Sequence, residues 1–213
     1  MRILVAVPTY ETIYPDVFRA LWYLDKGGHE VLFEYVRGYD VATARNNIVR
    51  VALNKKADYA LMVDNDVILP PDALVNLLDG GKDVVLGYYA YREPNRTYDG
   101  KTCVGKLENE RGEIFIGYPL EALYTGDELR ALRDKGETKI EIHGGGMGCA
   151  LLKTSLFKRF TYPWFAWVNY NDENKNCLSE DLYFCEQLHC GAVPIYTDTR
   201  VGCAHIMRNA QWP

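Results

Sequence analysis

Two aspartates separated by a single residue follow an apolar run of the sequence. Asp64-Asn65-Asp66 comes directly after residues 57–63, which read as a buried strand. A turn at the end of such a strand can aim both carboxylates at one divalent ion, because Mg²⁺ and Mn²⁺ prefer oxygen ligands. Such an ion is most useful beside phosphates, since it neutralises their charge and stabilises a diphosphate leaving group. A turn that leads into the next helix is the alternative, and the motif alone leaves both interpretations open.

Further polar residues are expected at the same edge of a sheet. Ligands of open α/β sheets bind beyond the carboxyl ends of the strands, and Pro8-Thr9-Tyr10-Glu11 ends the first apolar run. Thr9 and Glu11 could bond a base or ribose and Tyr10 could pack on the base; a plain turn is the alternative. Arg45 stands near the start of a predicted helix, where it opposes the helix dipole. It therefore needs an anion, either a phosphate or one of the aspartates, unless it lies on a solvated helix face.

Three later segments carry residues suited to chemistry. Residues 144–148 hold four glycines, which favours close approach of a ligand to the backbone, with a bulged core strand as the alternative. Ser179-Glu180-Asp181 puts two carboxylates in the first turn of a predicted helix. There they either supply a general base or simply stabilise the helix. His205 ends the last predicted strand, and it becomes a metal ligand only if the fold brings it to Asp66.

The elements that must position these residues alternate regularly over the first 87 residues. Strands are predicted at 2–7, 30–36, 59–63 and 83–86, and helices at 14–26, 41–56 and 70–78. This alternation predicts an α/β fold with a mainly parallel sheet and helices on both faces. The polar stretch 88–138 is expected to be an inserted flap with hairpins at 102–106 and 113–116 and a helix at 127–135. Beyond it we predict a strand at 139–142, helices at 154–160 and 179–189, and strands at 193–196 and 201–206.

The composition is that of an ordinary globular protein. The 213 residues are 48% hydrophobic and 25% charged, which fits a single domain over 1–213. The net charge of −5 disfavours general nucleic-acid binding. No apolar run approaches the ~20 residues of a membrane span, and the first residues lack the features of a signal peptide. The six cysteines form no C-x-x-C pair, so we expect them to be reduced and mostly buried in a cytoplasmic protein.

The order of these segments resembles the GT-A glycosyltransferases, the nucleotide-diphospho-sugar transferase fold, and in particular glycosyltransferase family 2. The resemblance covers roughly residues 3 to 206. Residues 8–11 are similar to the end of the first strand in that family, and Asp64-Asn65-Asp66 is similar to its D-x-D metal motif. Residues 144–148 resemble its glycine-rich acceptor-side strand and Ser179-Glu180-Asp181 its x-E-D motif. His205 is similar to its C-terminal metal-ligand histidine.

This resemblance implies a metal-dependent glycosyltransferase. It implies Mn²⁺ or Mg²⁺ bound by Asp66 and His205, with Asp64 on the metal or the ribose. It implies a hydroxyl acceptor, either a glycan, a lipid-linked molecule or a small molecule, that Asp181 deprotonates with Glu180 as the substitute base. The UDP- or GDP-linked sugar donor would contact Pro8, Thr9, Tyr10, Glu11, Arg45, Asp64 and Asn65. The acceptor would contact Gly145, Gly146, Met147 and Trp164, although a hydrophobic core suits Trp164 equally well.

Two features depart from the family's pattern. The acidic pair that usually grips the base is replaced by Arg37-Gly38-Tyr39-Asp40. Ala44-Arg45-Asn46 instead resembles a segment of some retaining mannosyltransferases of this fold. Transfer with inversion at the anomeric carbon is the expected reaction, and a retaining transferase on the same scaffold is the first alternative. A non-catalytic protein that binds nucleotide sugars is the second. A nucleotidyltransferase is disfavoured, since residues 8–11 lack the glycine- and arginine-rich loop of that class.

Overall fold

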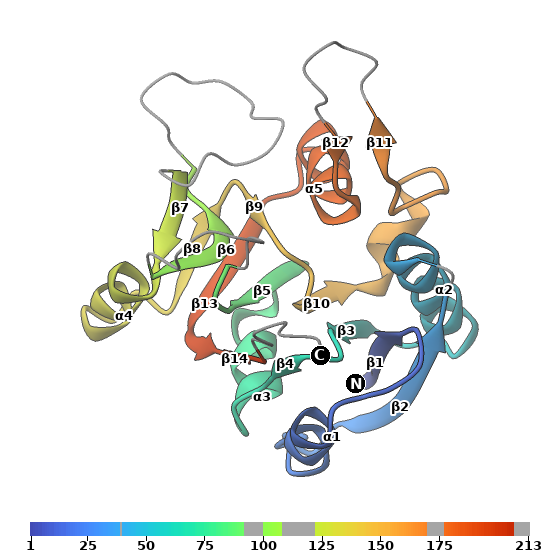
Figure 1. Ribbon diagram of the computed structural model, residues 1–213, viewed down its shortest axis with the longest axis horizontal. Coiled ribbons are helices and arrows are strands. Elements are labelled where there is room, and N and C mark those ends of the chain that lie inside the picture. Colours follow the sequence, from blue (N-terminus) through green and yellow to red (C-terminus); the bar gives the residue numbers. More distant parts are fainter. Residues whose placement is uncertain (39, 92–99, 108–121, 170–176, 207–213) are drawn as a thin grey trace, which may run out of the picture.

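A seven-stranded sheet with the order β2-β1-β3-β10-β5-β13-β8 lies at the centre of the computed structural model (Figure 1). The structure describes residues 1–38, 40–91, 100–107, 122–169 and 177–206. The strands of this sheet are β1 (Arg2–Thr9), β2 (Glu30–Arg37), β3 (Tyr59–Val63), β5 (Val84–Tyr88), β8 (Lys139–Ile142), β10 (Cys149–Lys153) and β13 (Ile195–Gly202).

The sheet is mixed and mainly parallel, as predicted. Strands β1, β2 and β3 pair in parallel, and so do β5 and β13. Strand β10 lies antiparallel between β3 and β5, and β8 is antiparallel to β13. The strands that follow one another in the predicted alternation are therefore not all neighbours. A strand from the second half of the chain separates β3 from β5.

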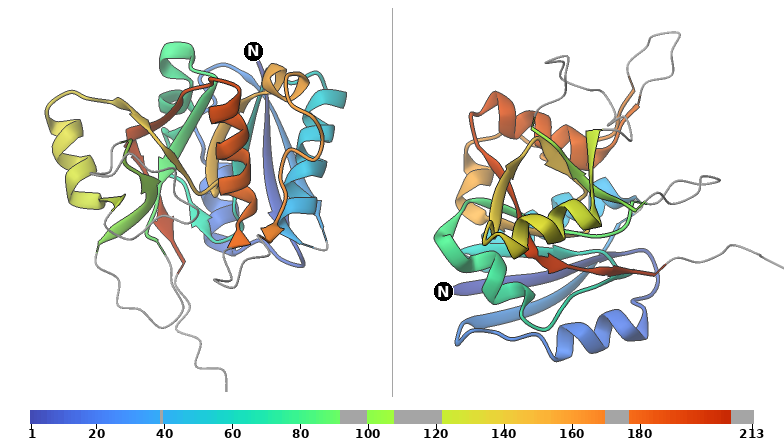
Figure 2. Two further views of the ribbon diagram at one scale, coloured as in Figure 1. Left: turned by 90° about the horizontal axis from the view of Figure 1, so that it is seen from above. Right: turned by 90° about the vertical axis from the view of Figure 1, so that its left-hand side faces the viewer.

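Helices cover both faces of the sheet. Figures 1 and 2 show α1 (Pro15–Trp22) and α3 (Ala73–Leu78) on one face, with α2 (Val41–Asn54) and α5 (Glu180–Cys190) on the other. Strand β1 is buried from Ile3 to Thr9 because it has a strand on each side and helices over each face. None of the helices in the described residues has the length and apolar character that crossing a membrane requires.

Smaller elements surround the main sheet. Strands β4 (Val67–Ile68) and β14 (Ala204–His205) form a two-stranded pair, and β11 (Val168–Asn169) pairs with β12 (Cys177–Leu178). Strands β6 (Lys101–Gly105), β7 (Leu123–Thr125) and β9 (Gly144–Gly145) form a third sheet. Helix α4 (Gly126–Asp134) follows β7 and begins with a capping box between Thr125 and Glu128. Of these elements, β6, β7 and α4 lie within the stretch 88–138 predicted as a flap; its predicted hairpin at 113–116 falls outside the described residues.

Three element predictions need correction. The predicted helix at 154–160 is a short 3-10 helix, η3 (Thr154–Lys158), and a second one, η1 (Asp79–Gly81), follows α3. The helix predicted over 14–26 ends at Trp22, well before the left-handed glycines 27 and 28. The strands predicted at 193–196 and 201–206 are instead the continuous β13, followed by β14. The polar residues that suggested a break are accommodated because Asp198, fully buried in β13, pairs with Lys139 and Arg200.

Candidate nucleotide and metal site

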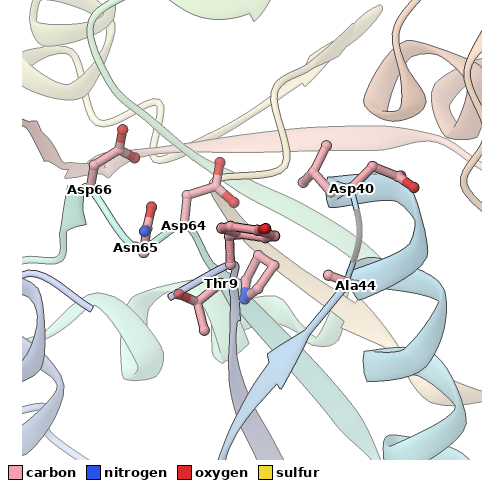
Figure 3. Close-up of a pocket in the computed structure, with 10 residues that line it drawn as sticks. Thr9, Asp40, Ala44, Asp64, Asn65 and Asp66 are labelled. Carbon is pink, nitrogen blue, oxygen red and sulfur yellow. The ribbon is translucent and has the colours of Figure 1, made fainter. Parts of the chain in front are cut away.

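A cavity of about 360 Å³ lies at the carboxyl ends of β1 and β3. The connections after β1, β2 and β3 form its walls. Figure 3 shows Asp64, Asn65 and Asp66 on one side of the cavity and Asp40 and Ala44 on the other, with Thr9 between them. The residues that line the cavity are Pro8, Thr9, Tyr10, Gly38, Asp40, Val41, Ala44, Asp64, Asn65 and Asp66.

Thr9, at the end of β1, and Asn65, after β3, shape the cavity, whereas Tyr10 is exposed to a ligand. The Thr9 hydroxyl and the Asn65 amide both donate to the Thr12 carbonyl, at 2.7 and 2.9 Å, and so hold the loop against the end of β3. The Tyr10 side chain is 70% exposed, so its ring is available for stacking. Glu11 is exposed and is not among the lining residues, so the structure gives no support to its predicted contact with the nucleotide.

Asp40 and Gly38 build the opposite wall and start helix α2. Both Asp40 carboxylate oxygens accept from Thr43, one from the backbone N at 3.0 Å and one from the hydroxyl at 2.8 Å. The backbone hydrogen bond from Thr43 lowers the pKa of Asp40, and the side chain acts as the N-cap of the helix. A Cβ on Gly38 would lie 2.6 Å from the Ala44 backbone N, so only glycine fits this turn.

The structure brings His205 to Asp66, as the metal hypothesis requires. The pairing of β14 with β4 sets His205 opposite Val67, and the Ile206 N donates to the Asp66 carbonyl at 2.9 Å. The His205 Nε2 lies 3.5 Å from the Asp66 Oδ2. The His205 Nδ1 contacts the Ala90 carbonyl at 2.9 Å, and since a carbonyl only accepts, Nδ1 carries a proton. The ring is therefore held with Nε2 facing the carboxylate.

An imidazole nitrogen facing a carboxylate oxygen suits a divalent cation such as Mn²⁺. Within the described parts of the chain, no group of three His, Cys, Asp or Glu side chains is placed to hold a metal ion. Asp64, predicted as a further ligand, has both carboxylate oxygens in contact with Arg45. The pair Asp66 and His205 is thus the part of the predicted metal set that the structure assembles.

Arg45 is buried, with 2% of its surface exposed, and does not line the cavity. Its predicted role as a nucleotide contact needs correction, and so does the alternative of a solvated helix face. Its Nη2 lies 2.9 and 3.2 Å from the Asp64 oxygens. Its Nη1 lies 3.3 Å from Glu180 Oε1 and 3.9 Å from Asp181 Oδ2. Of the anions proposed from the sequence, an aspartate is the partner, joined by Glu180 and Asp181 in the first turn of α5.

The two acidic residues at the start of α5 differ in environment. The Glu180 side chain is 5% exposed, and burial raises its pKa from 4.5 to about 7, although Arg45 opposes the shift. The Asp181 side chain is 22% exposed, and its Oδ2 accepts a long contact from the Met147 N at 3.4 Å. Burial also raises the pKa of Asp64, again against the effect of Arg45. Asp181 is therefore the more accessible carboxylate of the α5 pair.

The glycine-rich segment approaches protein atoms, not an open acceptor site. A Cβ on Gly145 would lie 2.8 Å from the Cys103 carbonyl, and one on Gly146 would lie within 2.5 Å of the Tyr89 hydroxyl. A Cβ on Gly148 would lie 2.7 Å from the same hydroxyl. These glycines let β9 and the start of β10 pack against β6 and Tyr89. The packing explains the glycines without an acceptor, so their predicted contact with an acceptor has no support from the structure.

Two further residues assigned to the acceptor are core residues. Met147 is fully buried and Trp164 is 8% exposed. The Trp164 Nε1 donates to the Phe157 carbonyl at 3.0 Å, and its ring packs edge-on against Phe157. Neither side chain offers a face on which an acceptor sugar could stack. For Trp164 the hydrophobic-core alternative is the correct one.

Tyr89, which follows β5 directly, is a site residue that the sequence did not single out. Its hydroxyl accepts from the Gly148 N at 3.0 Å, and its ring packs edge-on against His205 with the centroids 5.2 Å apart. The Gly148 carbonyl in turn accepts from the Asp64 N. Tyr89 thus joins the metal-ligand candidate to the D-x-D strand. The available signal was its place at the carboxyl end of a parallel strand.

The mixed, mainly parallel seven-stranded sheet, with β10 antiparallel between β3 and β5, is that of a GT-A fold. No protein-family model matches the chain, and no curated protein matches its sequence. Among solved structures, A197 from STIV aligns with a TM-score of 0.62 at 20% identity, covering 98% of this chain and 87% of A197.

Two other solved structures are similar over nearly the whole of this chain. GalNAc-T7 with UDP, GalNAc and Mn²⁺ aligns with a TM-score of 0.63 at 12% identity, covering 99% of this chain and 44% of GalNAc-T7. TarS 1–349 of S. aureus in complex with UDP aligns with a TM-score of 0.50 at 14% identity, covering 96% and 60%. This chain therefore spans less than two thirds of either of these two proteins. At such identities the similarity shows a shared fold.

Proposed function

We propose that this protein is a metal-dependent glycosyltransferase that moves a sugar from a nucleotide-diphosphate sugar to a hydroxyl acceptor. The observation that carries the proposal is the Asp66–His205 pair beside a cavity at the carboxyl ends of β1 and β3. Two proteins of the same fold have structures with UDP, and one of these also holds Mn²⁺. The GT-A fold and the ligands of these proteins support the donor class, a UDP- or GDP-linked sugar.

The donor nucleoside would lie in the cavity. Tyr10 offers the exposed ring for stacking on the base, while Pro8, Thr9 and Asn65 shape the walls. The Asp64 carboxylate is 26% exposed at the cavity and would contact a ribose hydroxyl. The volume of about 360 Å³ suits a nucleotide better than a large oligosaccharide.

Charge makes the divalent ion necessary for donor binding. The described residues that line the cavity include Asp40, Asp64 and Asp66 and no lysine or arginine. A bare diphosphate would be repelled by these carboxylates. Mn²⁺ or Mg²⁺ bound by Asp66 and His205 would neutralise the diphosphate and stabilise it as the leaving group. Water and phosphate oxygens would supply the other ligands.

Asp181 is proposed as the base that takes the proton of the acceptor hydroxyl. It is the more accessible of the two carboxylates in the first turn of α5, and an accessible base supports transfer with inversion at the anomeric carbon. Glu180 is too buried to reach an acceptor. The anomeric configuration of the product, measured by NMR, distinguishes inversion from the retaining alternative.

Calorimetry of UDP and GDP with the protein, with and without Mn²⁺, tests the metal and donor sites. We expect binding only in the presence of Mn²⁺, and Asp66→Ala should weaken it roughly 100-fold because one of two protein ligands is lost. Asp16→Ala, a change to an exposed carboxylate on α1, is the control and should bind normally. Mn²⁺-independent binding, or an unchanged affinity of Asp66→Ala, would refute the metal assignment.

Asp181→Asn tests the base in the same protein. The variant should keep the Mn²⁺-dependent nucleotide affinity while donor turnover, followed as release of UDP from UDP-sugars, falls by roughly 10² to 10⁴-fold. The amide keeps the shape of the carboxylate but cannot accept the proton. Near-normal turnover would place the base elsewhere, and no turnover by the unmodified protein with any UDP- or GDP-sugar would favour a binding protein without catalysis.

A further inference from the structure

We propose that Arg45 is a positioning residue that holds Asp64 and the Glu180–Asp181 pair in one arrangement without touching the nucleotide. The inference rests on the proposed transferase function, since it concerns how the base is set relative to the donor-side aspartate. It assigns to Arg45 a role different from the donor contact suggested by the sequence.

The burial of Arg45 requires an explanation. Removing a guanidinium from water is costly unless carboxylates compensate for the lost hydration. Arg45 also lies near the N-terminal end of α2, where a positive charge opposes the helix dipole. Three carboxylates compensate for both the lost hydration and the unfavourable helix dipole, and each of them belongs to the candidate site. A residue needed only for helix packing would not require a charge at this position.

The guanidinium joins three parts of the chain that are distant in sequence. Through Nη2 it contacts Asp64 at the end of β3, and through Nη1 it faces Glu180 and Asp181 in the first turn of α5. Because the guanidinium is planar and rigid, contacts at its two ends fix the separation between β3 and α5. The donor-side carboxylate and the proposed base are thereby held at a set distance.

The contacts of Arg45 differ between the two sides in a way that suits catalysis. Nη2 makes hydrogen bonds to Asp64, at 2.9 and 3.2 Å, which hold that carboxylate toward α2. Among the described residues, Nη1 has no hydrogen-bond partner and is buried, so it acts on Glu180 and Asp181 through charge alone. Asp181 can therefore accept a proton without breaking a hydrogen bond to Arg45.

Direct contact of Arg45 with a phosphate is disfavoured by its position. Helix α2 presents Val41 and Ala44 to the cavity, and Arg45 lies behind the Asp64 carboxylate. A nucleotide would have to displace Asp64 to reach the guanidinium. Arg45 would therefore act on the reaction by holding the carboxylates of Asp64, Glu180 and Asp181 in place.

The test compares Arg45→Met, Arg45→Lys and the control Arg50→Met. Arg50 lies on the exposed side of the same helix, over the Tyr162 ring. For Arg45→Met we expect the affinity for Mn²⁺ with UDP to stay within about threefold of normal, while Mn²⁺-dependent UDP-sugar hydrolysis falls about 100-fold. Arg50→Met should change none of these.

Arg45→Lys separates charge from shape and remains informative if Arg45→Met fails to fold. A lysine keeps the charge but cannot contact Asp64 and the Glu180–Asp181 pair at once, so hydrolysis should remain reduced about tenfold. Normal hydrolysis by Arg45→Lys would overturn the positioning role. A loss of UDP affinity parallel to the loss of rate in either variant would overturn the inference, because Arg45 would then act on donor binding and not on the placement of the base. If the unmodified protein fails to bind UDP with Mn²⁺, the proposed function and this inference both fall.

Discussion

Glu180 is a carboxylate whose pKa the fold raises into the neutral range. Burial raises its pKa to about 7 from an ordinary 4.5, although Arg45 lies 3.3 Å away. Because the folded pKa lies above the unfolded value, its contribution to stability is fully present below about pH 4.5. That contribution is lost as the pH rises through about 7.

Glu180→Gln should therefore stabilise the protein in a pH-dependent way. Glutamine has the same size but cannot ionise, so it avoids the cost of a buried charge above neutral pH. We expect the free energy of unfolding, relative to the unmodified protein, to rise by about 1 to 3 kcal/mol between pH 5 and pH 8. Urea denaturation at both pH values measures this. A difference that stays constant with pH would mean that Glu180 is ionised throughout.

At the residue scale, the sequence identified groups whose chemistry is evident from their type. Asp66, His205 and Asp181 were named because oxygen and imidazole ligands and first-turn carboxylates are recognisable in a chain of letters. The partner of Arg45 was left open between phosphate and aspartate, since it depends on the packing of α5 against α2. Tyr89 was missed because a tyrosine gives no chemical signal until its neighbours are known.

The glycine-rich segment shows how one element is shaped by another. Gly148 lies where a Cβ would come 2.7 Å from the Tyr89 hydroxyl and 2.8 Å from the Asp64 Oδ2. Glycine is needed here for close approach and not for a left-handed backbone, since Gly148 has no positive φ. The element therefore helps to fix both the tyrosine and the donor-side aspartate.

Gly148→Ala should destabilise the protein by roughly 1 to 3 kcal/mol, because two packed side chains must move to admit one methyl group. It should also weaken the Mn²⁺-dependent affinity for UDP. Gly126→Ala is the matched control: its nearest neighbour is the flexible end of Arg130 at 3.2 Å, so we expect a change within about 0.5 kcal/mol. Equal stability of the two variants in thermal unfolding would argue against the packing role.

At the element scale, periodicity predicted most helices and strands but not their lengths or pairings. Strand β3 has the predicted bounds, because its five residues are all apolar and buried. Strand β13 was divided in two, since buried charges cannot be distinguished from loop residues without their partners. Strands β4 and β14 have two residues each, too short for any periodic signal, yet their pairing places His205 beside Asp66.

Across the whole molecule, one buried ion cluster joins three elements far from the cavity. Asp198 in β13 accepts from Lys139 in β8 at 2.6 Å and from Arg200 at 2.7 and 2.9 Å. Both cations also donate to the Asn76 carbonyl of α3. The cluster ties the edge of the sheet to the helix that covers it.

Asp198→Ala should cost about 3 kcal/mol or more, because it leaves two cations without their buried partner. Asp79→Ala removes a second carboxylate partner of Arg200. Because that carboxylate is 61% exposed, the change should cost at most about 1 kcal/mol.

The stability that Asp198 contributes should also depend on pH. The hydrogen bonds from Arg200 and Lys139 lower the pKa of Asp198 against the effect of burial. The contribution of Asp198 to stability is thus present above its unfolded pKa of 3.8. It is lost as the pH falls through the lower pKa of the folded state. The unfolding free energies of the unmodified protein and of Asp198→Ala should therefore converge as the pH is lowered. A difference that stays constant with pH would contradict this.

The sequence by itself determined the α/β class, the strand that carries Asp64-Asn65-Asp66 and the residue types able to bind a metal or take a proton. These follow from local periodicity and side-chain chemistry, which act over a few residues. Only the tertiary structure decided that β10 enters between β3 and β5, that Arg45 is buried against three carboxylates, and that the glycines pack against Tyr89. The physical reason is that pairing and burial depend on contacts between segments up to about 140 residues apart, and no local pattern encodes which segments will meet.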